Sequence, residues 1–125
     1  MKFAKALIFI SGVLFIGFGA GFVFAPHFFF NSFTGGLLTT TSSAIDMRAT
    51  YGGLGLGVGI WFLLCAQQNL RLGLSGAIAV FSSIVFGRIV GFGLDGNANI
   101  VMYVFVVLEA VFLTAAFLVL QRIGK

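Results

Sequence analysis

Six polar residues of this chain stand inside or at the edge of long apolar segments, where a polar side chain needs a specific partner. They are two arginines, three carboxylates and a tyrosine: Arg48, Arg88, Glu109, Asp46, Asp95 and Tyr51. A charge inside a bilayer costs about 2.5–3.5 kcal/mol even on a lenient insertion scale. Guanidinium and carboxylate groups so placed pair with each other or hold a polar group of a ligand. These six are the candidate ligand-binding residues.

The spacing of these residues predicts one shared site. Arg88 and Asp95 are seven positions apart, which places them on one helix face, ~10 Å apart along the axis. Glu109 would lie ~14 Å from the start of its own segment at Ile100. We predict that Arg48 and Arg88 turn toward Glu109, so that the charges form a buried polar site in the outer half of a helix bundle.

That site has two interpretations. In the first, the charges are ties between helices that set their register, since buried ion pairs are weak evidence of function. In the second, they line a pocket, open to the outer side, that binds a lipid-like or amphipathic small molecule with an anionic or polar head. No nucleophile–histidine–acid set and no metal-ligand spacing is visible, so an enzyme is the less favoured class and no cofactor or metal is expected.

The elements that must position these residues are membrane-spanning helices. Hydrophobic residues make up 60% of the 125 residues and charged residues 8%, against about 45–50% and 25% in soluble domains. Four apolar segments are each about 20 residues long, enough to cross a hydrocarbon layer of ~30 Å. We predict an all-α integral membrane four-helix bundle, a single transmembrane domain over 1–125, with helices at about 3–25, 44–66, 72–94 and 100–120.

The connections carry their own signals. The first segment is expected to be retained as a span, because its apolar run exceeds the 7–15 residues of a signal-peptide core. Pro26 ends that helix, and the phenylalanines within 28–33 predict a short interfacial segment between the first two spans. Ser43 and Asp46 have capping-box spacing at the start of the second helix. Turns are expected at 67–71 and 95–99.

The basic residues indicate orientation rather than a binding patch. Five of the seven flank the apolar segments at one set of ends: Lys2, Lys5, Arg71, Arg122 and Lys125. The positive-inside rule therefore predicts that both termini are cytoplasmic. No basic patch interleaved with aromatic residues is present, which argues against a nucleic acid partner.

Glycine pairs at a spacing of four residues predict close helix contacts of the GxxxG type. The pairs are Gly17/Gly21, Gly53/Gly57, Gly55/Gly59 and Gly87/Gly91. Packing inside the bundle is the favoured meaning, and contact between copies of the chain is the alternative. The glycine-rich stretch 53–59 is not a nucleotide-binding loop, because no strand precedes it and no Lys-Ser/Thr follows it.

The charged motifs resemble those of a known family. Arg48–Leu54 reads Arg-Ala-Thr-Tyr-Gly-Gly-Leu, Gly87–Gly91 reads Gly-Arg-Ile-Val-Gly, and Asp95-Gly96 and Glu109 follow. This order and spacing is similar to that of a bacterial four-span membrane family catalogued as domain of unknown function 4345. The resemblance covers nearly the whole chain. It implies four spans, a multi-pass protein of the bacterial cytoplasmic (inner) membrane and the same charged residues, but no activity.

Three functions fit the pattern. The first is a membrane protein that binds a lipid-like or amphipathic ligand, with membrane lipid as its natural environment. The second is an accessory or assembly subunit whose phenylalanine-rich outer loop packs on a membrane-protein partner or a second copy. The third, less favoured, is a small proton-coupled transporter: a proton carrier must gain and lose a proton near the working pH, whereas neighbouring guanidinium groups favour the charged form of Glu109.

Overall fold

The structure is a computed structural model, and it describes residues 1–124. Its elements are α1 (Lys2–Phe24), α2 (Pro26–Thr34), α3 (Thr41–Met47), the π-helix η1 (Arg48–Gly53), α4 (Leu54–Gln68), α5 (Leu70–Asp95) and α6 (Ile100–Ile123). Four helices are long and apolar enough to cross a membrane: Lys2–Phe24, Thr41–Gln68, Leu70–Asp95 and Ile100–Ile123. The second of these joins α3, η1 and α4. The predicted all-α membrane bundle is confirmed as a fold class.

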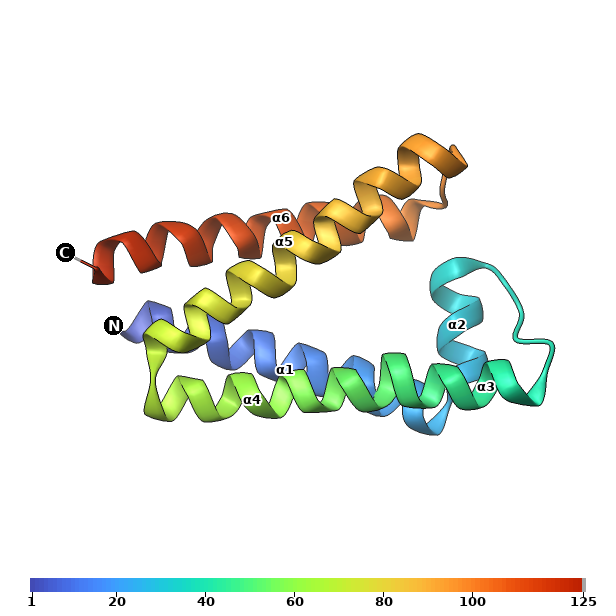
Figure 1. The fold of residues 1–125 in the computed structure, drawn as a ribbon, viewed down its shortest axis with the longest axis horizontal. Coiled ribbons are helices and arrows are strands. Elements are labelled where there is room, and N and C mark those ends of the chain that lie inside the picture. Colours follow the sequence, from blue (N-terminus) through green and yellow to red (C-terminus); the bar gives the residue numbers. More distant parts are fainter. Residues whose placement is uncertain (125) are drawn as a thin grey trace.

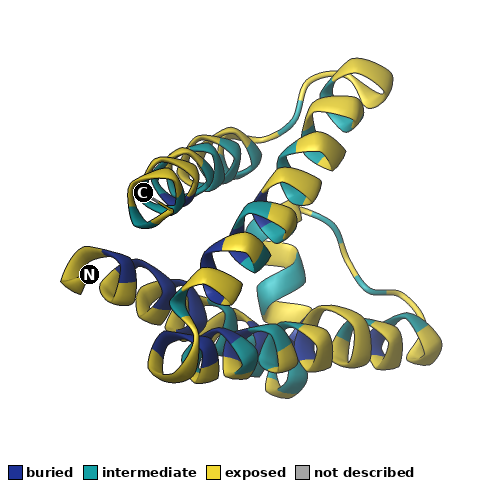
Figure 2. Ribbon diagram, turned by 60° about the vertical axis from the view of Figure 1, so that its left-hand side comes forward, coloured by how far each residue is buried: buried dark blue, intermediate teal, exposed yellow. Residues whose placement is uncertain are grey.

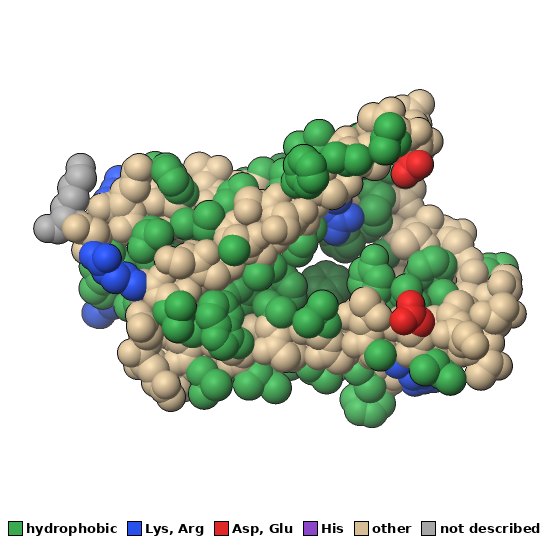
Figure 3. Space-filling model, viewed as in Figure 1, with side chains coloured by type: hydrophobic (Ala, Val, Ile, Leu, Met, Phe, Trp, Pro, Cys, Tyr) green, Lys and Arg blue, Asp and Glu red, His purple; other side chains and the backbone are tan. Residues whose placement is uncertain are grey.

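The four long helices run up and down between two ends of the molecule (Figure 1). Both termini and the α4–α5 turn lie at one end, which we call the terminal end; α2, the start of α3 and the α5–α6 turn lie at the other, the distal end. α1 packs along α4, and α5 packs along α6. α5 draws away from α4 toward the distal end, and a hollow opens between them on the face shown in Figure 3.

The hydrophobic core lies in the terminal half. Its buried members come from the start of α1, the end of α4, the start of α5 and the end of α6: Ala4, Leu7, Ile8, Phe62, Ala66, Leu74, Ala77, Phe81 and Ala116. Beyond Phe81, α5 has no buried residue, and Figure 2 shows its distal half mostly exposed. In a spanning helix such a surface faces lipid, so the distal half is where a site could open to the bilayer.

Glycines let α1 and α4 approach closely. A Cβ added to Gly19 would lie 2.6 Å from the Leu56 nitrogen, and one added to Gly59 would lie 2.7 Å from the Gly12 carbonyl oxygen. Of the predicted pairs, Gly55/Gly59 faces α1, whereas a Cβ on Gly57 or on Gly87 would meet nothing within 4 Å. A spacing of four recurs on every face of a glycine-rich helix, so spacing alone could not select the glycines in contact.

The second span begins one turn earlier than predicted. Thr40, and not Ser43, is its N-cap: the Thr40 hydroxyl accepts a hydrogen bond from the Ser43 N–H at 3.0 Å, and Ser43 Oγ accepts one from the Thr40 N–H at 3.3 Å. Both residues suit the cap position chemically, and Thr40 gains a serine three residues on that completes the capping box. Asp46 is therefore not part of the capping box. It accepts a hydrogen bond from the Thr50 hydroxyl at 3.2 Å.

The connection between α4 and α5 is shorter than the predicted turn at 67–71. A single residue, Asn69, separates α4 from α5, and its side chain accepts a hydrogen bond from the Leu72 N–H at 3.0 Å. Pro26 does end α1 and stands at the first turn of α2, as its fixed φ and missing N–H favour.

Helix α2 bridges α1 and α6 at the distal end. The Phe33 ring lies 5.4 Å, between centroids, from both Phe18 of α1 and Phe105 of α6. The Asn99 side chain donates a hydrogen bond to the Phe33 carbonyl at 3.0 Å. The predicted short segment between the first two spans is therefore a helix that packs between α1 and α6.

Candidate functional site

The centre of the site is an ion pair between α5 and α6. Arg88 Nε–H donates to both carboxylate oxygens of Glu109, at 3.1 and 2.8 Å, and Nη2–H donates to Oε1 at 2.8 Å. The planar guanidinium matches the carboxylate at two points, which fixes the orientation of both side chains. Their exposed fractions are 23% for Arg88 and 15% for Glu109, so the pair is half-buried.

Two further residues of α6 hold the guanidinium. Arg88 Nη1–H donates to the sulfur of Met102 at 3.3 Å, and the guanidinium carbon lies 5.3 Å from the centroid of the Phe105 ring. A guanidinium near an aromatic ring is attracted by the negative charge of the ring face. Phe105 also contacts Phe33 of α2, so α2 helps to hold this ring in place.

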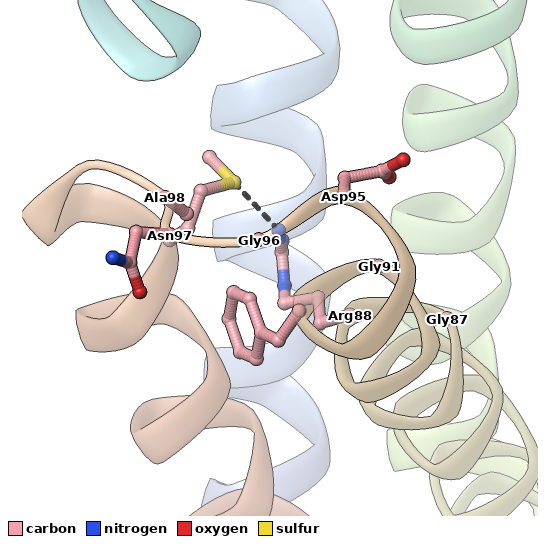
Figure 4. Close-up of a pocket in the computed structure, with 9 residues that line it drawn as sticks. Gly87, Arg88, Gly91, Asp95, Gly96, Asn97 and Ala98 are labelled. Carbon is pink, nitrogen blue, oxygen red and sulfur yellow. Dashed lines mark hydrogen bonds between the residues drawn. The ribbon is translucent and has the colours of Figure 1, made fainter.

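A cavity of about 310 Å³ adjoins this pair at the distal end of α5 and α6. It is lined by Gly87, Arg88, Gly91, Phe92, Asp95, Gly96, Asn97, Ala98 and Met102. In Figure 4 the Arg88 side chain extends toward the methionine sulfur, and Asp95 stands at the end of α5. Glycine at 87 and 91 keeps the wall of α5 free of side chains, which is what leaves room for the cavity.

Arg48 and Tyr51 lie elsewhere, against the end of α1, and Asp46 accepts a hydrogen bond from Thr50 of its own span. Arg48 donates a hydrogen bond from Nη1 to the carbonyl oxygen of Val23. This oxygen is in the last turn of α1, where helix carbonyls have no partner within the helix and a positive charge is favoured. The Tyr51 ring lies 5.2 Å from the Phe22 ring, between centroids.

The predicted single cluster is therefore two groups on different helix pairs. Within residues 1–124, no hydrogen bond or ion pair joins Arg48, Asp46 or Tyr51 to Arg88 or Glu109, whose salt bridge is the one ion pair of this part of the chain. Nor is any charged side chain of these residues buried, so the prediction of a buried polar site is wrong on this point. The cause is the rotation of the second span, which turns the Arg48 face toward α1.

The π-helix η1 accompanies that rotation. A π-turn widens the helix, and such turns are frequent at functional sites. Here Arg48 and Gly52, four positions apart, both lie against the end of α1: a Cβ on Gly52 would come within 2.8 Å of the Val23 nitrogen. The sequence motif Arg48–Gly53 thus forms the π-helical segment that packs the second span against the first.

Comparison with known families places the chain. The family model described as Domain of unknown function (DUF4345) matches residues 3–120. The chain belongs to this family. No curated protein and no solved structure matches it.

Sequence reasoning missed several residues of this DUF4345 protein that contact Arg88 or line the cavity beside it. Phe105 and Met102 stand four and seven positions before Glu109, hence on its face of α6, and that spacing was the available signal. Phe92 stands four positions after Arg88, on its face of α5, so the same signal was available for it. Asn97 carried no such signal, because the chain path after Asp95 decides its place. Among the residues described, no group of three or more His, Cys, Asp or Glu side chains could hold a metal ion.

Proposed function

We propose that this small multi-pass membrane protein binds a lipid-like or amphipathic small molecule in the cavity between the distal halves of α5 and α6. The observation that carries the proposal is a half-buried, bidentate Arg88–Glu109 pair beside an open cavity in the lipid-facing half of the bundle. An ion pair whose only role was to hold α5 against α6 would need no cavity beside it.

The number of hydrogen-bond donors on the Arg88 guanidinium supports a ligand at this residue. A guanidinium has five N–H groups. Glu109 accepts from Nε and Nη2, and the Met102 sulfur, a weak acceptor, takes one from Nη1. Within residues 1–124 these are the hydrogen bonds of this side chain, so two N–H groups can donate to an oxygen of a ligand.

The surroundings suit an amphiphile. In the same turn as Arg88, on other faces of the helix, α5 presents large apolar side chains to the bilayer: Phe86 is 70% exposed and Ile89 57%. The polar head of an amphiphile would contact Arg88, and its apolar tail would contact these exposed apolar side chains. Burial of the tail between helix and lipid adds little selectivity, so the head group would decide which molecule binds.

Within the bacterial inner membrane that we propose as the protein's location, the charge distribution supports an extracytoplasmic position for the cavity. The basic residues Lys2, Lys5, Arg71 and Arg122 belong to the terminal end, where Figure 3 shows blue side chains gathered. By the positive-inside rule this end is cytoplasmic and the cavity opens toward the opposite surface.

The two alternatives have less support. A proton-coupled cycle through Glu109 would have to break its bidentate pair with Arg88 in every turnover. An accessory role has one observation in its favour: Phe28 and Leu37, at the distal end, are 68% and 74% exposed and could contact a partner.

Native mass spectrometry on the full chain, extracted gently with its lipids, tests the proposal. We expect the wild-type protein to retain a stoichiometric small-molecule adduct. The double variant Arg88→Met, Glu109→Met should lose it, because it removes the polar head contact while keeping side-chain volume. Arg48→Met is the matched control, since this arginine binds α1, and it should keep the adduct.

Each variant must retain the wild-type circular dichroism spectrum. A wild-type protein without an adduct, or a folded double variant with an undiminished adduct, would contradict ligand binding at this cavity. The same spectra report the oligomeric state, and crosslinking in native membranes at Phe28 would detect a protein partner instead.

A further inference from the structure

The charge of the cavity differs from the charge that the sequence alone suggested. The sequence predicts two arginines, Arg48 and Arg88, beside Glu109, a net positive group, and an anionic or polar head group. In the structure Arg48 binds the end of α1, so the charged side chains that line the cavity are those of Arg88 and Asp95, and Glu109 pairs with Arg88 beside it. Because Glu109 pairs with Arg88, the carboxylate of Asp95 is the charge left over.

The end of α5 adds to this negative potential. Asp95 is the last residue of the helix, and the last turn contains no basic residue. The C-terminal end of a helix carries a partial negative charge on its carbonyl groups, which a cation stabilises. In α1, α2, α4 and α6 a backbone N–H of the capping residue bonds one of these carbonyls. α5 ends at Gly96, with φ 94°, and lacks such a bond among the residues described.

An aromatic ring lines the same cavity. Phe92 lines the cavity and stacks on Tyr103, with 4.8 Å between ring centroids and 20° between planes. The Asp95 carboxylate turns back along α5, since a Cβ added to Gly91 would lie 3.8 Å from its Oδ2. A carboxylate and an aromatic face together are the groups that bind an organic ammonium ion.

We infer that the ligand of this cavity has a zwitterionic head, with its ammonium group at Asp95 and Phe92 and an acceptor oxygen at Arg88. The inference rests on the proposed function and names the class of head group. A metal ion does not fit, because one exposed carboxylate offers too few ligands.

The order of groups along α5 agrees with a lipid in a bilayer. The exposed apolar residues Phe86 and Ile89 lie at the height of Arg88 along α5, on other faces of the helix, and Asp95 lies ~10 Å farther along the axis at the distal end. An amino-phospholipid has the same order from the membrane interior outward: acyl chains, then phosphate, then ammonium. The phosphate would accept from Arg88, and the ammonium would reach Asp95.

Competition between two phospholipids with identical acyl chains tests the inference. Phosphatidylethanolamine and phosphatidylglycerol are titrated against the full chain in detergent, and bound lipid is counted by native mass spectrometry. We expect phosphatidylethanolamine to be preferred about three- to fivefold, the size of an exposed ionic contact. Asp95→Asn should abolish the preference. Asp46→Asn, which alters a carboxylate beside Thr50 on the second span, is the matched control and should keep it.

The outcomes separate this inference from the proposed function. Equal binding of both lipids, a preference for phosphatidylglycerol, or a preference that survives Asp95→Asn would overturn the zwitterionic head while binding at Arg88 stands. Absence of any lipid whose retention depends on Arg88 and Glu109 would overturn both. Asp95 is exposed, so its replacement by asparagine is not expected to unfold the protein.

Discussion

Arg88 of α5 and Glu109 of α6 are paired in the half of the molecule where α5 is otherwise unburied. The pair makes N–H···O contacts of 2.8 to 3.1 Å, whereas the buried residues of α5 are Gly73, Leu74, Ala77 and Phe81, all nearer its start. The ion pair is therefore a principal contact between the distal halves of α5 and α6, and it has both a structural and a binding consequence.

Removing one member of this pair should destabilise the protein. For Glu109→Gln we expect a loss of about 1–3 kcal/mol in the free energy of unfolding, less than for a fully buried pair because both side chains keep some exposure. The double variant Arg88→Met, Glu109→Met should regain most of this loss, since no charge is left unpaired. Unfolding by titration with sodium dodecyl sulfate measures both. A double variant that is no more stable than Glu109→Gln would show that the loss does not come from leaving a charge unpaired.

Alanine at two glycines of α4 should have opposite effects. Gly59→Ala places a Cβ 2.7 Å from the Gly12 carbonyl oxygen, so α1 and α4 must separate, at a cost of about 1–3 kcal/mol. Gly57→Ala meets nothing within 4 Å and should be neutral or stabilising by up to about 1 kcal/mol, the gain in helix propensity. Thermal melting in detergent compares the two, and equal melting temperatures would refute the close contact between α1 and α4.

Arg48 should act on the end of α1 rather than on ligand binding. Arg48→Met removes a charged donor to the Val23 carbonyl, and we expect a loss of about 1–2 kcal/mol with faster amide exchange near residues 24–29. Arg48→Lys should retain part of the effect, because the positive charge at the helix end remains. Hydrogen–deuterium exchange measures the change. If Arg48→Met lost its bound lipid without a change in amide exchange, Arg48 would belong to the binding site instead.

The orientation of the chain predicts which surface residues a membrane-impermeant reagent reaches. In a Cys65→Ala background, we expect Asn97→Cys at the distal end to be labelled by an impermeant maleimide in intact cells. Gln68→Cys, at the α4–α5 turn, should be labelled only after the membrane is broken. The reversed labelling pattern would place the cavity on the cytoplasmic side.

The class of the protein follows from local properties of the sequence. Segments of about 20 apolar residues are the length of a span whatever their neighbours, and Pro26 ends α1 because its ring fixes φ and removes an N–H. The match of Arg88 with Glu109 was also predictable, since each is a charge inside an apolar segment and needs a partner of opposite sign. These inferences depend on one segment, or on one pair of charges, at a time.

Tertiary structure decided which helix face meets which neighbour. Arg48 was expected beside Glu109, yet the π-turn at Arg48–Gly53 and the close approach at Gly52 and Gly59 turn it toward the free carbonyls of α1. Helix rotation depends on packing summed over a whole interface, which the spacing of charges within one segment does not encode. That rotation left Arg88 and Asp95 as the charged side chains that line the cavity, with Glu109 paired to Arg88 beside it, and so it decided the net charge of the site.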